Sequence, residues 1–228
     1  MDKPKKSSKL ERPVQTANLP SEIHTLTSKQ ALALGLQHHT AGDLGKAESI
    51  YQQILKTDPN CPEALHLLGV ISHQAGKSDQ AADLIKKALF HKPDFPEAHS
   101  NLGVSLEKLG NLDEAVAHYQ KAVAINPDYA EAHSNLGVVL QKLGQVEEAV
   151  ASCRKALAIN PDYAEAHYNL GNAFKGLGRL DEATASYQKS IKINPNVAEA
   201  HHILGLVFRD LGNLEEALAR CQRAIELN

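Results

Sequence analysis

A repeating pattern of 34 residues restricts the fold of this sequence more than any other feature. A period of 20 to 50 residues is typical of solenoids and similar arrays, in which each repeat is one supersecondary unit. Four ladders of residues share the same step. They are the glycines at 35, 69, 103, 137, 171 and 205, the glycines at 42, 76, 110, 144, 178 and 212, the alanines at 47, 81, 115, 149, 183 and 217, and the prolines at 59, 93, 127, 161 and 195.

One period has the hydrophobic pattern of a helical hairpin. Gly144 separates two apolar stripes, at a position where a left-handed residue commonly ends a helix. Pro161 ends the second stripe, because proline cannot donate a backbone hydrogen bond and restricts the residue before it. Helical spacing is seen in both stripes, which are Ala132, Leu136, Val139, Leu140 and Leu143, then Val146, Ala149, Val150, Cys153, Ala156 and Leu157. The sequence therefore predicts two helices per period.

The junctions between periods carry a possible helix-start signal. Asp162 lies three residues before Glu165, the spacing of a capping box, in which the two side chains bond backbone amides at the start of a helix. We expect such a pair to begin the first helix of each later hairpin. The equivalent pairs are Asn60/Glu63, Asp94/Glu97, Asp128/Glu131 and Asn196/Glu199.

Glycines inside the predicted helices indicate close packing. Gly137 lies in the middle of a helix, where glycine costs about 1 kcal/mol relative to alanine. Repetition of that cost in every period indicates that the two helices of a hairpin approach closely at this point. A hairpin cannot bury both of its faces alone, so we expect the hairpins to stack, with stability arising from neighbouring repeats along a solenoid.

These residues match a known family. The spacing of Leu136-Gly137, Leu140, Ala149, Cys153, Ala156 and Pro161 resembles the tetratricopeptide repeat. We place six repeats at 28–61, 62–95, 96–129, 130–163, 164–197 and 198–228. The resemblance implies an all-α, right-handed superhelical solenoid of helix-turn-helix repeats, with the first helix of each hairpin lining a concave surface. The first two repeats depart most, since His38 and Ser72 occupy a large apolar position of the pattern.

The two ends of the chain differ from the repeats. Residues 1–27 are rich in Lys, Ser and Pro and lack periodicity, so we predict a disordered basic tail. At the other end, Leu218, Cys221 and Ile225 of the last helix have no further hairpin to pack on. Solenoids normally finish with a polar capping element. We therefore expect the natural protein to continue beyond Asn228.

Charge and composition argue against several classes of partner. The net charge is −3, and residues 1–27 carry five basic and three acidic groups, so the remaining chain is acidic. It therefore lacks the basic stripe that a nucleic-acid binder would need. The sequence shows neither an apolar run of about 18 residues for a membrane span nor the apolar region of a secretory signal. Three cysteines without a C-x-x-C pair indicate a reducing, cytoplasmic environment.

A polar stripe beside the predicted core is the best candidate for a binding site. Asparagine amides offer one acceptor and two donors, enough to pair with a peptide bond. We therefore predict that Asn101, Asn135 and Asn169 hold an extended polypeptide by its backbone. The alternative is that the repeats are recent copies that carry asparagine along without use. The stripe comprises Glu97, Asn101, Val104 and Lys108, then Glu131, Asn135, Val138 and Lys142, then Glu165, Asn169, Asn172 and Gly176. Its leading glutamates argue against the acidic peptides that the family's carboxylate clamp grips.

The asparagine ladder resembles one particular use of the family. Its setting in Asn101-Leu102-Gly103 and Asn135-Leu136-Gly137 resembles the repeat region of bacterial O-linked N-acetylglucosamine transferases. That resemblance implies that the repeats recruit protein substrates for a separate C-terminal glycosyltransferase domain, none of which lies within this sequence. Two functions stay open: a free-standing adaptor, and the substrate-recruiting region of a larger enzyme.

No constellation of residues predicts catalysis, a cofactor or a metal. His99, His133, His167 and His201 recur every 34 residues. Successive repeats are separated by about two helix spacings of 8–10 Å, far beyond the roughly 2 Å distances of shared metal ligands. We interpret these histidines as packing residues at the hairpin seam. Cys153 and Cys221 are interpreted as small core residues. The sequence thus predicts a protein-binding chain that is not an enzyme.

Overall fold

The computed structural model describes residues 26–227, and the predicted disordered tail lies outside them apart from its last two residues. The described residues form twelve helices and no strand, as the sequence predicts. The helices are α1 (Ser28–Thr40), α2 (Leu44–Thr57), α3 (Pro62–Gln74), α4 (Ser78–His91), α5 (Pro96–Lys108), α6 (Leu112–Ile125), α7 (Ala130–Lys142), α8 (Val146–Ile159), α9 (Ala164–Gly176), α10 (Leu180–Ile193), α11 (Ala198–Asp210) and α12 (Leu214–Glu226).

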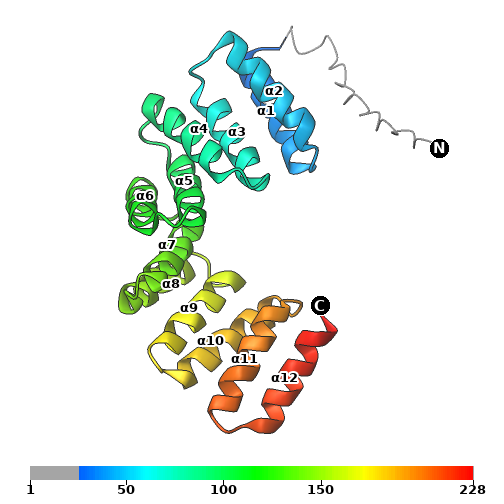
Figure 1. Ribbon diagram of the computed structural model, residues 1–228, viewed down its shortest axis with the longest axis vertical. Helices are drawn as coiled ribbons and strands as arrows, with labels where there is room; N and C mark the ends of the chain where they lie inside the picture. Colours follow the sequence, from blue (N-terminus) through cyan, green and yellow to red (C-terminus); the bar gives the residue numbers. More distant parts are fainter. Residues whose placement is uncertain (1–25, 228) are drawn as a thin grey trace, which may run out of the picture.

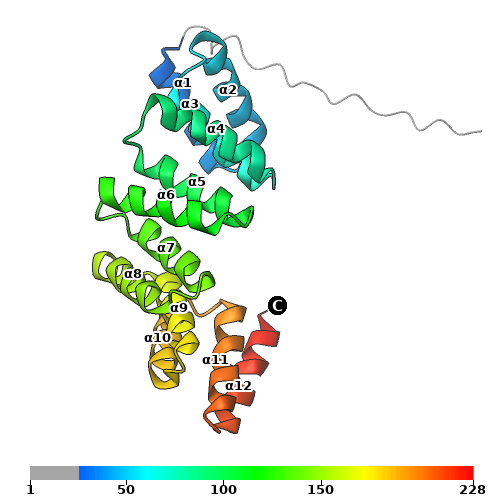
Figure 2. The same cartoon turned by 60° about the vertical axis from the view of Figure 1, so that its left-hand side comes forward.

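Consecutive helices pair into six hairpins, and the hairpins stack in chain order into a curved superhelix (Figures 1 and 2). Helix α6 lies on the outer side of the arc and α5 on the inner side (Figure 1). First helices of successive hairpins contact one another, as α7 does with α9 and α5 with α7. The predicted solenoid is confirmed, and the odd-numbered helices of its middle repeats line its inner side.

The turn inside each hairpin depends on a left-handed glycine. The φ angle of Gly144 is 78°, and the equivalent glycines of the other five hairpins also have positive φ. The Gly144 amide donates to the carbonyl of Gln141 at 3.0 Å, and the next amide, that of Gln145, donates to Leu140 at 2.9 Å. These bonds occupy carbonyls that the end of α7 would otherwise leave unpaired. The predicted helix stop is confirmed.

The predicted capping boxes at the repeat junctions are wrong. The residue before α9 is Tyr163, not Asp162, and its side chain makes no capping bond. The reason lies in the preceding turn, where the Asn160 side chain accepts the amide of Asp162 at 3.2 Å. This turn occupies the residues around Pro161, so the helix begins after Tyr163 rather than at Asp162. The other junctions also lack a side-chain cap, with Cys61, Phe95, Tyr129 and Val197 at the position before the helix.

The glycines inside the first helices lie where the two helices of a hairpin meet, as predicted. A Cβ atom placed on Gly137 would lie 2.6 Å from Cys153 Sγ and 3.2 Å from the Ala149 carbonyl oxygen. The same contact uses fully buried tyrosines in three other hairpins, which are Tyr51, Tyr119 and Tyr187 opposite Gly35, Gly103 and Gly171. Cys153 is buried, consistent with its predicted core role, whereas Cys221 is half-buried.

Buried apolar residues divide into two clusters along the superhelix. One cluster extends from Ala82 in α4 to Ala217 in α12, and a smaller one extends from Ala31 to Ile71. The first repeats thus have a core of their own, at the end where His38 and Ser72 depart from the repeat pattern. On α12 the side chains of Leu218 and Ile225 are 62% and 75% exposed. No helix among residues 26–227 is both long and apolar enough to cross a membrane.

Candidate peptide-binding groove

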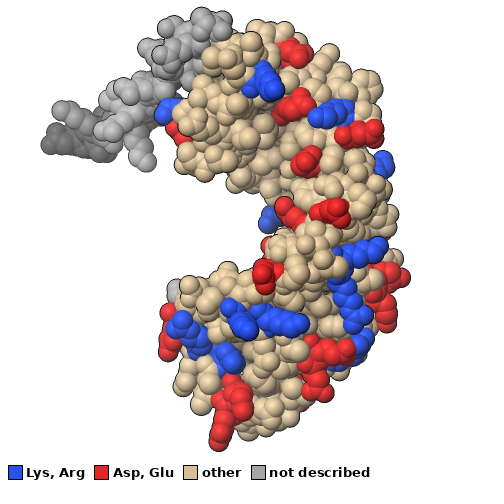
Figure 3. All heavy atoms as spheres, turned by 180° about the vertical axis from the view of Figure 1, so that it is seen from behind, with Lys and Arg blue, Asp and Glu red and all other residues tan. Residues whose placement is uncertain are grey.

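The inner side of the superhelix is a broad hollow that faces away from the outer helices (Figure 3). Polar contacts between successive first helices lie along it. The Gln141 side chain of α7 donates to the backbone carbonyl of Asn172 in α9 at 3.1 Å. Lys142 of α7 forms an ion pair with Glu107 of α5 at 2.7 Å. Since both bonds join neighbouring repeats, the residues that line the groove also fix its curvature.

Two asparagines of the predicted ladder bind the preceding repeat. Asn169 Nδ2 donates to Ser134 Oγ at 3.0 Å, and Asn101 Nδ2 lies 2.8 Å from His66 Nε2. Asn169 is only 7% exposed. An amide that already serves as a structural donor keeps its carbonyl oxygen and a second N–H for other partners.

Asn135 is the asparagine of the ladder whose side chain is available. It is half-buried on α7, and within residues 26–227 its amide has no hydrogen-bond partner. The residue equivalent to Ser134 in the preceding repeat is Ser100, and no hydrogen bond joins it to Asn135. The bond that anchors Asn169 is thus absent at Asn135, so this amide can pair fully with a ligand.

The other predicted groove residues differ in their contacts. Asn172 Oδ1 accepts the Tyr187 hydroxyl of α10 at 2.7 Å, which directs its amide into its own hairpin. Lys142 is exposed and paired with Glu107, whereas Lys108 is exposed without an ion pair in the described part of the chain. The predicted stripe therefore contains structural residues as well as residues that a ligand could reach.

The glutamates at the start of the first helices form an uncompensated acidic row. Glu97, Glu131 and Glu165 are exposed, and none has an ion pair within residues 26–227. Although Glu131 is exposed to solvent, the surrounding protein desolvates its carboxyl in part and raises its pKa, and the nearby Glu165 carboxylate raises it further. Acidic side chains flank the middle of the hollow (Figure 3). This edge of the groove favours neutral or cationic ligands over acidic ones.

The recurring histidines are buried. His99 contacts His118 of α6 at the predicted hairpin seam, and all four histidines also bond the junction between repeats. His167 Nε2 bonds the Pro161 carbonyl at 2.9 Å, which ties α9 to the turn that precedes it. The equivalent bonds join His99 to Pro93, His133 to Pro127 and His201 to Pro195.

The sequence did not predict two contacts that histidines make. His99 Nδ1 lies 2.9 Å from His118 Nδ1, although 19 residues separate them in the chain. His66 is 6% exposed, packs edge-on against Phe95, and burial lowers its pKa to about 4. His66 and His118 do not recur at the 34-residue step, so the repeat pattern did not predict these contacts.

Stacked hairpins of one length, with first helices along an inner groove, define a helical-repeat solenoid. Comparison with family models identifies the repeat type. A model described as TPR repeat matches residues 108–144 and 142–178, and models described as tetratricopeptide repeat match 38–102, 164–197 and 186–219. The chain therefore belongs to the tetratricopeptide-repeat proteins. No curated protein sequence matches it significantly.

Solved structures show the same architecture. MamA is 29% identical, with a TM-score of 0.63 over 70% of this chain and 94% of MamA. TTC0263, a thermophilic TPR protein of Thermus thermophilus, is 27% identical, with a TM-score of 0.66 over 80% of this chain and 99% of its own. YrrB, a TPR protein with an unusual peptide-binding site, is 21% identical, with a TM-score of 0.61 over 78% and 92% of the two chains. The last likeness concerns the fold alone.

Proposed function

We propose that this chain is a scaffold that binds extended polypeptide segments in its concave groove and has no catalytic role. The observation that carries the proposal is the unpaired amide of Asn135, held on α7 between repeats whose asparagines are anchored. An amide fixed by the helix and open to the groove can accept one backbone N–H and donate to one backbone carbonyl. Such recognition depends little on the partner's sequence.

The neighbouring groups support the same role. Asn101 and Asn169 keep one acceptor and one donor each beside Asn135, so a backbone could be held over three repeats. The acidic row of Glu97, Glu131 and Glu165 disfavours acidic segments. YrrB, which shares the fold, is described by its peptide-binding site, and this likeness is consistent with a peptide ligand here.

Replacement of Asn135 by alanine tests this proposal. The probes are dodecapeptides selected for binding to the wild-type chain from a random display library. Loss of two hydrogen bonds, each contributing about 0.5–1.5 kcal/mol, should weaken binding roughly 5- to 150-fold by fluorescence anisotropy. Asn135 is preferable to a triple substitution with Asn101 and Asn169, because Asn169 is buried and bonded to Ser134, so its loss would also alter the fold.

The matched control is Asn111→Ala, which removes an exposed asparagine from the turn between α5 and α6. This variant should bind the selected peptides as the wild type does, and both variants should keep the wild-type helicity by circular dichroism. Unchanged affinity of Asn135→Ala, with helicity intact, would contradict the proposed role of the groove.

The substrate-recruiting region of a glycosyltransferase is the second candidate function. The asparagine ladder, placed between successive first helices, is the observation that favours it. The coding sequence that follows the codon of Asn228 distinguishes the two functions. A glycosyltransferase domain encoded there would support the second candidate, and a stop codon or an unrelated domain would support the free-standing adaptor.

A further inference from the structure

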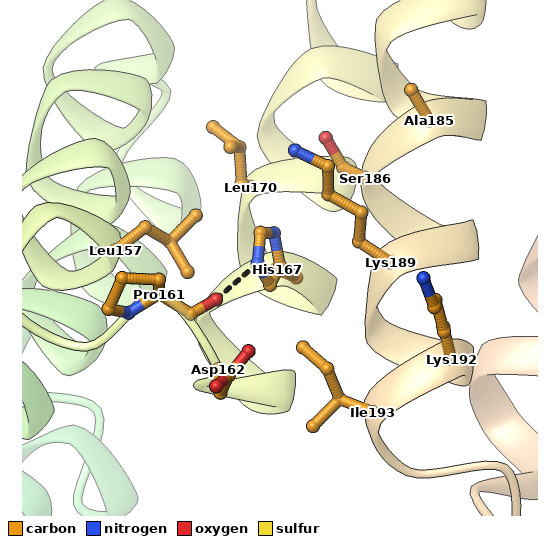
Figure 4. Close-up of a pocket in the computed structure, with 10 residues that line it drawn as sticks. All are labelled: Leu157, Pro161, Asp162, His167, Leu170, Ala185, Ser186, Lys189, Lys192 and Ile193. Carbon is orange, nitrogen blue, oxygen red and sulfur yellow. Dashed lines mark hydrogen bonds between the residues drawn. The ribbon is translucent and has the colours of Figure 1, made fainter.

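Three equivalent cavities lie between the second helices of successive hairpins, away from the concave groove. The first, of about 830 Å³, lies between α8, α9 and α10 (Figure 4). The second, about 540 Å³, and the third, about 560 Å³, occupy the corresponding places one and two repeats earlier. Their recurrence shows that the cavities are a product of the repeat itself.

Each cavity combines an apolar lining with a lysine and an isoleucine that lie one turn apart on the same face of the second helix. In the first cavity Leu170 of α9 is part of the apolar lining, and Lys189 and Ile193 come from α10 (Figure 4). Lys192 adds a second ammonium there. The corresponding residues are Leu136, Lys155 and Ile159 in the second cavity and Leu102, Lys121 and Ile125 in the third. Ile125 and Ile193 are 37% and 38% exposed.

One lysine of each cavity lacks an ion-pair partner that would give it a structural role in the described part of the chain. None of Lys121, Lys155 and Lys189 forms an ion pair within residues 26–227, and no carboxylate lies three or four residues away from them on their helices. Lys121 and Lys155 also precede the last turn of α6 and α8, where a cation would offset the helix dipole. Their charge is therefore available to a ligand.

The third cavity carries an additional anchor. Phe90 lines it and is 81% exposed at the end of α4. Lys86 and Lys121 lie close enough to His118 for their charges to contribute to lowering its pKa, so two ammonium groups converge on this cavity, opposed by Asp94. Exposed aromatic side chains beside apolar pockets are typical energetic anchors of interfaces.

We propose that the row of cavities on the outer face, along α4, α6, α8 and α10, is a second docking surface whose partner is an extended acidic polypeptide segment with apolar side chains. Each cavity accepts an apolar side chain, and the adjacent lysine pairs with a carboxylate of the same segment. Two lysines oppose Asp162 in the first cavity, Lys155 stands alone in the second, and two lysines oppose Asp94 in the third, so each cavity has a net charge of +1. With that charge and an apolar lining, the surface suits a peptide better than the closely spaced phosphates of a nucleic acid. The acidic residues of α6, α8 and α10 lie in their first turns, whereas the cavity lysines of these helices lie toward the C-terminal ends, so the preference for acidic segments belongs to the cavity row.

The test uses a fluorescein-labelled peptide, (Gly-Asp-Leu)4, at about 0.15 M salt, where exposed charges more than about 8 Å apart are largely screened. The comparison probes are (Gly-Lys-Leu)4 and (Gly-Asp-Ser)4. The variant Lys121→Glu/Lys155→Glu/Lys189→Glu should bind the acidic apolar peptide at least about tenfold more weakly than the wild type, because three attractive contacts become repulsive. The wild type should bind (Gly-Lys-Leu)4 and (Gly-Asp-Ser)4 more weakly than (Gly-Asp-Leu)4, since the first lacks the carboxylates and the second the apolar side chains.

The matched control is Lys29→Glu/Lys56→Glu/Lys77→Glu, which changes the net charge equally at exposed sites on α1, α2 and the turn before α4. It should leave the affinity within about twofold of wild type. Equal weakening by both triple variants, or loss of (Gly-Asp-Leu)4 binding in Asn135→Ala, would overturn the proposal. An absence of binding to the wild type would overturn it too. Self-association of the wild type that the Lys121/Lys155/Lys189 variant abolishes would also overturn it, because a second copy of the chain would then occupy this face. Failure of this proposal would not contradict the peptide binding proposed for the concave groove.

Discussion

Alanine at Gly171 is expected to destabilise the α9–α10 hairpin by about 1–3 kcal/mol, the usual cost of overpacking a filled core. The added Cβ would lie 2.7 Å from Cε1 and 2.8 Å from Cδ1 of Tyr187. The Tyr187 ring cannot move aside, because its side chain is fully buried and its hydroxyl is bonded to Asn172 Oδ1 at 2.7 Å. The urea midpoint of helix loss by circular dichroism should fall accordingly.

The matched control is Gly176→Ala in the same helix. The nearest atom to its added Cβ is Val146 Cγ1 at 3.4 Å, an ordinary contact, and the residue does not have positive φ. Removing glycine from a helix here should leave stability unchanged or raise it by up to about 1 kcal/mol. Equal midpoints for Gly171→Ala and the wild type would show that the hairpin tolerates a methyl group at its closest approach.

Acidification is expected to destabilise the N-terminal repeats through His66. Burial lowers the pKa of His66 to about 4 from an ordinary value of 6.5, so the neutral imidazole is favoured in the folded chain. As the pH falls below 6.5 the unfolded chain takes up this proton first, and the stability contributed by neutral His66 is lost until the folded chain is protonated near pH 4. One proton corresponds to 1.36 kcal/mol per pH unit, so the loss between pH 7.5 and 4.5 is about 2–3 kcal/mol.

His66→Gln should remove this part of the pH dependence, because glutamine does not titrate and its carbonyl can still accept from Asn101. The control is His202→Gln, which changes an exposed histidine on α11 and should preserve the wild-type dependence. Urea midpoints at pH 7.5 and pH 4.5 give the comparison. If His66→Gln lost as much stability on acidification as the wild type, the acid sensitivity would belong to other groups, such as the His99–His118 pair.

The groove was only partly predictable from the sequence. The position of Asn101, Asn135 and Asn169 on one face follows from helical spacing, and the structure joins Asn101 and Asn169 to the preceding first helix. Their different bonding did not follow, because it depends on the partner across the repeat junction. Asn101 pairs with His66 and Asn169 with Ser134, whereas Asn135 has no such bond among residues 26–227. The cavities of the outer face were missed for a similar reason, since each takes its lining from three helices.

The sequence by itself determined the helices, their turns and their number. These features depend on local geometry: a left-handed glycine such as Gly144, a proline after each of the first five hairpins, and apolar residues at helical spacing. Only the tertiary structure decided where α9 begins relative to Asp162, which amides of the groove stay unpaired, and how far burial lowers the pKa of His66. These outcomes depend on side chains brought together from different repeats, and a one-dimensional period does not specify which atoms meet across a junction.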